Sequence, residues 1–161
     1  MNAWKIARTR RGAAALLVVI WLPVLLAVTS LAVNLGRILV DRSRLQSAAD
    51  LAALAAVQSV DWDALAEGEI TLVPELAEMA ARDYSRENLE RLMDREAKEV
   101  RVWVINGSVD DPAPHPVTGD DLEYPTVVVR IDVDRPASVL GAALGSFTLS
   151  AEADASVRPR E

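Results

Sequence analysis

Residues 11–58 read RGAAALLVVIWLPVLLAVTSLAVNLGRILVDRSRLQSAADLAALAAVQ, and the architecture of the chain follows from this stretch. Its first part carries no charge over the 25 residues 12–36, which are mostly Ala, Leu and Val. As an α-helix this segment would be about 37 Å long, and the hydrocarbon core of a membrane is about 30 Å thick. The stretch therefore predicts a membrane-spanning helix.

The charges on either side of this span are unequal. Four basic residues and no acid precede it, whereas the rest of the chain carries 13 basic and all 24 acidic residues. The positive-inside rule then places residues 1–11 in the cytoplasm and the bulk of the chain outside. The alternative is a removable secretory signal peptide, but its apolar region would be only about 7–15 residues long.

The helix is predicted to continue beyond the membrane, because residues 37–58 contain no Pro and no Gly. Apolar positions recur there at helical spacing and mark one face, formed by Ile38, Leu45, Ala49, Ala52 and Ala56. Because Ala adds little thickness, we expect this face to be a packing surface for another layer of protein. Pro23, inside the span, either kinks the helix or is one of the ordinary prolines that membrane helices tolerate.

The remaining hundred residues predict a small head. Residues 61–73 read as a connecting loop, and Pro74 suits the first turn of a second helix that runs towards Lys98, with a break near Asn88. Period-two alternation predicts three strands, at residues 100–105, 127–134 and 147–158. Residues 110–124 are expected to form an exposed loop and residues 136–144 a short helix ended by Gly145.

These elements predict an α+β fold, in which a long N-terminal transmembrane helix extends into a head with a second helix and a three-stranded antiparallel sheet. The expected divisions are a basic leader (1–12), the transmembrane helix with its external extension (13–58) and the head (59–161). A small sheet with one apolar face needs a cover. The outer half of the first helix is the available cover, so we expect the head to pack on it.

Composition excludes several functions. The net charge of −7 disfavours binding to nucleic acid, and the absence of Cys excludes disulfides, thiolate metal sites and cysteine nucleophiles. No second His or Cys is available to complete a site with His115, and the Asp pairs around it match no calcium-binding loop. Asn106-Gly107-Ser108 fits a glycosylation sequon but is first a turn signal. We expect no catalytic residue, no metal and no cofactor.

The quoted stretch resembles the N-terminal region of TadE/TadG-like proteins of Tad (Flp-type) pilus systems. The resemblance is carried by Arg11-Gly12, by Leu22-Pro23, by the run AVNLGR at residues 32–37 and by LQSAAD followed by AALAA at residues 45–56. It covers about the first 50 residues, in line with the hydrophobic span, and the remainder of the chain agrees in architecture only. It implies a pilin-like or assembly subunit that is anchored in the bacterial inner membrane.

Two departures from the family pattern bear on function. Family members usually carry an acid where this chain has Asn34. Prepilins have a Glu five residues into the mature chain; cleavage between Gly12 and Ala13 would put Leu17 there, and the first carboxylate is Asp41. TadG-like members also lack that Glu. Their DxSxS metal motif fails here at its last position, Arg158.

The sequence thus predicts a minor pilin or a membrane-anchored assembly subunit of a Tad (Flp-type IV) pilus or a related secretion filament. The alternative is an anchored envelope module that binds a ligand or partner unrelated to a filament. The expected partners are other pilins or pilus assembly proteins, lipid of the inner membrane and prepilin peptidase, whose cleavage site would be Gly12-Ala13.

Overall fold

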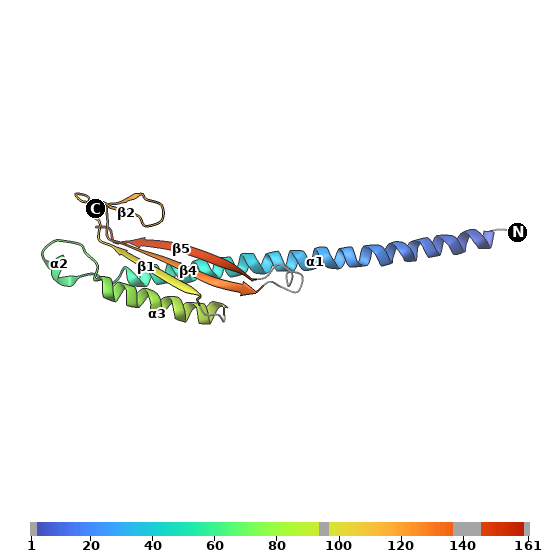
Figure 1. The fold of residues 1–161 in the computed structure, drawn as a ribbon, viewed down its shortest axis with the longest axis horizontal. Helices are drawn as coiled ribbons and strands as arrows, with labels where there is room; N and C mark the ends of the chain where they lie inside the picture. The colour runs from blue at the N-terminus through green and yellow to red at the C-terminus, as the bar shows by residue number, and fades with distance from the viewer. Residues whose placement is uncertain (1–2, 94–96, 137–145, 160–161) are drawn as a thin grey trace. The chain divides into compact units, whose positions relative to one another are not determined.

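The computed structural model describes residues 3–93, 97–136 and 146–159 of the chain (Figure 1). The chain divides into two compact units, Met1–Leu39 and Val40–Glu161. The first unit is formed by helix α1 (Ala3–Ala56), which also supplies residues 40–56 of the second unit. Helix α1 is continuous through Pro23, so this residue does not end it.

The sheet of the second unit has three antiparallel strands in the order β1-β4-β5. They are β1 (Glu99–Ile105), β4 (Thr126–Pro136) and β5 (Ser146–Ser156). In the central strand, Val129 pairs with Val102 on one side and with Ala153 on the other. The fold is therefore α+β with one long apolar helix, a further helix and a three-stranded antiparallel sheet, as the sequence predicts.

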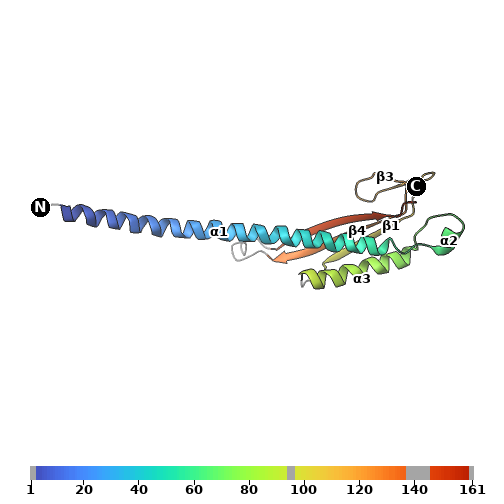
Figure 2. The same ribbon diagram turned by 180° about the vertical axis from the view of Figure 1, so that it is seen from behind.

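One face of this sheet is covered by helices. Figure 1 shows the sheet in front of residues 40–56 of α1, and Figure 2 shows the same helix in front of the sheet from behind. Alternate residues of β4 point into the core between them, and the fully or nearly fully buried side chains of β4 on this face are Val127, Val129, Ile131 and Val133. Ala77, Ala81 and Leu89 from α3 complete the core. The period of two in β4 is what places all four residues on one side.

Helix α3 (Pro74–Met93) begins at the predicted proline and is unbroken at Asn88, whose side chain donates a hydrogen bond to the Tyr84 carbonyl. The sequence predicts a helix that runs towards Lys98; its described part ends at Met93, and Lys98 itself is not helical. The Lys98 backbone N–H donates instead to the Asp132 carbonyl, 2.8 Å away, next to the start of β1. The spacing of acidic and basic residues favoured a longer helix, but the backbone of Lys98 is hydrogen-bonded to strand β4 instead.

The segment at residues 61–73 is not a plain loop, because it contains the short helix α2 (Trp62–Ala66). The Asp61 carboxylate caps this helix by accepting hydrogen bonds from the backbone N–H groups of Asp63 and Ala64. A bridge between Val60 and Leu72 closes the segment into a hairpin-like excursion.

The predicted loop at residues 110–124 also contains structure, the two-residue strands β2 (Ala113–Pro114) and β3 (Asp121–Leu122). Pro136 was expected to begin a short helix and is instead the last residue of β4. The rest of that expected helix lies outside the described residues.

Candidate functional site

The membrane-capable segment is the first candidate site. One helix of the described residues is long and apolar enough to cross a membrane, and it lies near the N-terminus, with a mean hydropathy of 2.7. From Leu16 to Val40 its large apolar side chains are exposed, except Ile38, which is half-buried. Exposed apolar surface of this extent suits lipid or another apolar helix rather than water.

The predicted cleavage site, Gly12-Ala13, lies within the helical backbone of α1. The structure describes no side chains there. Cleavage between these residues therefore remains a prediction.

Four of the five residues of the predicted packing face lie in the core of the head, and the fifth does not. Leu45, Ala49, Ala52 and Ala56 are completely buried in the core of the second unit. Ala48 and Ala53, which the sequence analysis did not single out, are equally buried. Ile38 is not among the core residues that the structure describes. The packing partner of the four core residues is thus the head of the same chain, and no surface of theirs is left for another subunit.

Two polar contacts fasten residues 40–56 of α1 to the sheet. Asp41 forms an ion pair with Arg135 near the end of β4, and both side chains are largely buried. The Gln46 side chain donates to the Glu152 carbonyl of β5 at 2.8 Å. Partners 94 and 106 residues away in the sequence leave no local pattern, so the sequence analysis missed both contacts.

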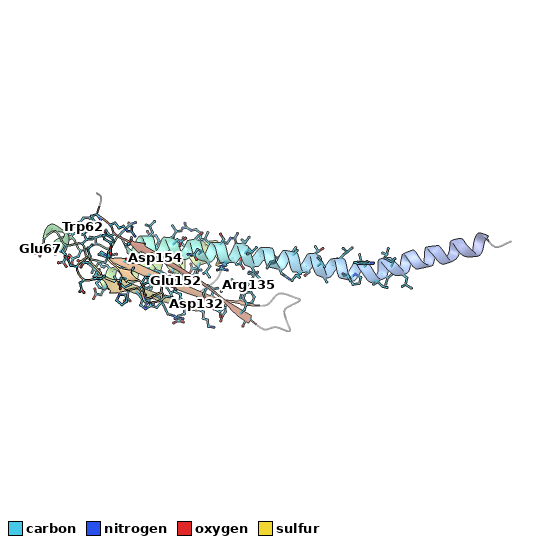
Figure 3. All side chains as sticks on the ribbon, turned by 90° about the horizontal axis from the view of Figure 1, so that it is seen from above. Trp62, Glu67, Asp132, Arg135, Glu152 and Asp154 are labelled. Atoms are coloured by element: carbon cyan, nitrogen blue, oxygen red, sulfur yellow. The ribbon has the colours of Figure 1, made fainter. Side chains whose placement is uncertain are left out.

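The second face of the sheet is charged. Arg101 pairs with Asp132 at 3.1 Å, and Arg130 lies 3.8 Å from Glu152. Figure 3 labels Asp132 on β4 and Glu152 and Asp154 on β5. The buried Nε atom of Arg130 and the buried Oδ1 atom of Asp132 lie 3.6 Å apart, an ion pair longer than a hydrogen bond. Arg130 lies directly opposite Glu152, whereas between β1 and β4 Arg101 lies opposite Arg130, so the contact of Arg101 with Asp132 is diagonal.

At the edge of this face the pKa of Asp134 is lowered. The main cause is the hydrogen bond that Thr148 donates to its carboxylate at 2.7 Å, and the second is the hydrogen bond from Lys98 at 3.1 Å. Both donors favour the charged carboxylate. The arrangement is typical of a surface network rather than of a general acid.

The candidate loop residues have structural partners. The Nδ1 atom of His115 accepts hydrogen bonds from the backbone N–H groups of Val117 and Thr118, so this ring caps a turn. The side-chain amide of Asn106 accepts from the backbone N–H of Leu72 and donates to its carbonyl. In the described part of the chain, no three His, Cys, Asp or Glu side chains lie close enough together to hold a metal ion.

The comparisons with known proteins bear on the anchor. A search of curated proteins and a search of solved structures found no match. A scan of family models matched residues 12–59. This range contains the apolar segment from Leu16 to Val40 and the whole predicted packing face. The matching family is described as Tad, "Putative Flp pilus-assembly TadE/G-like", so over residues 12–59 the chain carries the TadE/G-like region that the sequence resembles.

Proposed function

We propose that this protein is a membrane-anchored subunit of a Tad (Flp-type) pilus or a related secretion filament, present in few copies as a minor pilin or an assembly factor. The carrying observation is the TadE/G-like match over residues 12–59, which supports a pilus-related role. The match falls on a helix that is apolar enough to span a membrane and that continues into a folded head.

In this proposal, the apolar segment from Leu16 to Val40 makes the contacts with other pilus proteins. Leu45, Ala49, Ala52 and Ala56 of the packing face are buried inside the head, whereas most of the large apolar side chains from Leu16 to Val40 are exposed. A pilin-like partner or inner-membrane lipid would cover them. The proposed divisions are a leader at residues 1–12, the transmembrane helix with its external extension at residues 13–58, and a head at residues 59–161 that packs on residues 40–56 of that extension.

The absence of a carboxylate near the cleavage site argues for a low copy number. A new amino terminus in an apolar filament core needs a neighbouring carboxylate, because an unpaired charge there costs several kcal/mol, about 3–5 for a broken buried pair. Here the first carboxylate is Asp41, which pairs with Arg135. A subunit without that charge pair suits the base or tip of a filament, or a permanent anchor.

A cytoplasmic N-terminus and an extracytoplasmic head in the bacterial inner membrane complete the proposal. Four basic residues before the span support this orientation. The second candidate function is an anchored envelope module that binds a partner outside any filament, and an open groove in the head lined by Glu69, Asp111 and Glu123 favours it. Neither function requires catalysis, and the described residues offer no ready metal site.

Stoichiometry in sheared filaments tests the proposal. We expect the chain at a small fraction of the major pilin, or only in the membrane fraction with other assembly proteins. The intact mass then distinguishes the cleaved chain from the full-length chain, because processing would remove residues 1–12. If this chain were the dominant subunit of the filament, the argument from the missing carboxylate would be wrong. If deleting the gene left pilus assembly unchanged, the envelope module would be the better assignment.

A further inference from the structure

An open groove of about 430 Å³ lies at the end of the head where α1 ends, and we call it the tip groove. Four separate segments line it: residues 68–71 after α2, the turn after β1 from Asn106, residues 123–125 before β4, and Pro159. In Figures 1 and 2, α2 and the segments around β2 and β3 gather at this one end of the head.

The walls of the tip groove are held by specific contacts. Both hydrogen bonds of the Asn106 amide go to Leu72, which ties the turn after β1 to the excursion that carries α2. Gly107 is buried, and a Cβ atom there would come within 2.1 Å of the Leu122 carbonyl oxygen. The Arg158 guanidinium lies 5.5 Å from the centre of the Tyr124 ring, beside the groove. A groove with fixed walls loses little entropy when it binds a ligand.

The lining of the groove carries charge of one sign. Of the residues that the structure describes, Glu69, Asp111 and Glu123 line it and no Lys or Arg does, and the nearest cation shown is Arg158 beside Tyr124. Among the described residues none of these carboxylates has a cation within ion-pair distance, whereas Arg82, Arg86 and Arg91 on α3 each pair with an acid of their own helix. Three unpaired carboxylates at one opening attract a cationic group and repel an anionic one.

Apolar surface is exposed beside these carboxylates. Val109 in the groove wall is 65% exposed, and half-buried Ile70 and Tyr124 also face the groove. Trp62 on α2, labelled in Figure 3, is 73% exposed but is not among the residues that line the groove. An acidic surface without apolar patches would suit small cations, but this one suits a ligand with both a cation and an apolar group.

We propose that the tip groove binds an extended segment of a partner protein that presents Lys or Arg beside a small apolar side chain. We commit to a peptide as the occupant because the groove is open to solvent and sets carboxylates beside exposed apolar side chains, and its charge disfavours anionic lipid. This inference stands on the groove itself and goes beyond the proposed role in a pilus.

The test uses the full chain in a non-ionic detergent and fluorescein-labelled peptides measured by anisotropy. One peptide has the sequence Ser-Lys-Val-Lys-Ser-Gly, and its partner has Glu in place of both Lys. We expect saturable binding of the lysine peptide, corrected for empty micelles, and no binding of the glutamate peptide. Absence of saturable binding by the lysine peptide, or equal binding of the two, would overturn the proposal.

Variants locate the binding. The double variant Glu69→Gln/Glu123→Gln should weaken binding about fivefold to tenfold, as expected for the loss of two exposed ion pairs. Val109→Ser should weaken it without changing the charge. The matched control is Glu75→Gln/Glu90→Gln, which removes two exposed carboxylates of α3 outside the groove. If the control weakens binding as much as the groove variant, the attraction is a property of the net charge, and the groove is not the site.

Discussion

Ser85 is the residue whose environment departs most from what its side chain needs. It lies on α3, is completely buried, and its hydroxyl has no hydrogen-bond partner in the described part of the chain. A buried hydroxyl without a partner keeps its desolvation cost and gains nothing in return. An apolar side chain of similar size should therefore be better at this position.

Ser85→Ala should raise the free energy of unfolding of the head by about 1 kcal/mol, from the removed desolvation cost and the higher helix propensity of Ala. Ser47→Ala is the matched control, because Ser47 is exposed on α1 and donates to the Ser43 carbonyl. Thermal unfolding of the detergent-solubilised chain measures both. A loss of stability for Ser85→Ala would show that a water molecule satisfies the hydroxyl.

Asp134 gives the second prediction at the residue scale. Its lowered pKa means that the native state holds the charged carboxylate more strongly than the unfolded chain does. The stability it contributes is therefore present above the unfolded pKa and is lost as the pH falls through the lower, folded pKa. Thr148→Val removes the main cause and should move the pKa of Asp134 upward, towards its ordinary value. An NMR titration of the carboxyl carbon measures this directly, and an unchanged value would show that the hydrogen bond from Thr148 is not the main cause.

At the scale of elements, the alanines of the packing face place α1 in close contact with the sheet. Ala52 is completely buried against the core, whereas Leu54, two residues further on, is 54% exposed. A small residue at position 52 lets the backbone of the helix approach the sheet. A large residue there would force the two elements apart.

Ala52→Trp should destabilise the head by about 3 kcal/mol or more, and Leu54→Trp should change it by less than about 0.5 kcal/mol. Hydrogen exchange of the β4 amides measures the opening of the sheet in both variants. Leu54→Trp also tests lateral association, because this side chain is on the surface. Equal protection of β4 in the two variants would contradict a closely packed Ala52.

The elements that could be predicted from the sequence are those whose periodicity extends over many residues. The apolar run of α1 and the alternation at Val127 to Val133 are long enough to specify both the element and its buried face. Helix α2 was missed because it is five residues long, and its only signal is the Asp61 cap. The Asp41–Arg135 pair and the tip groove join segments that are far apart in the sequence, so they depend on the folded topology and not on any local pattern.

At the scale of the whole molecule, orientation in the membrane depends on a narrow difference in basic residues. Four of them precede the apolar span, and three, Arg37, Arg42 and Arg44, follow it closely. Orientation is set by Lys and Arg near the ends of the span, and acids contribute little. Asp41 therefore does not cancel an arginine in this balance, and the amino-terminal flank has an excess of only one.

This narrow excess makes the orientation testable. An alkaline phosphatase fused after Glu161, which is active only outside the cytoplasm, should be active in the natural chain. Lys5→Gln/Arg8→Gln reduces the leading flank to two basic residues, while it leaves Arg10-Arg11-Gly12 intact for prepilin peptidase. Phosphatase activity per fusion molecule should then fall, because the three arginines after the span would outnumber the leader.

The control adds Arg42→Gln/Arg44→Gln to the Lys5→Gln/Arg8→Gln variant and should restore the orientation. It lowers the count after the span to one, so activity should recover without any change to the leader. If the first double variant retained full activity, the flanking charges would not set the orientation. The length of the translocated head or a partner during insertion would then have to set it, since long domains are translocated largely regardless of their charge.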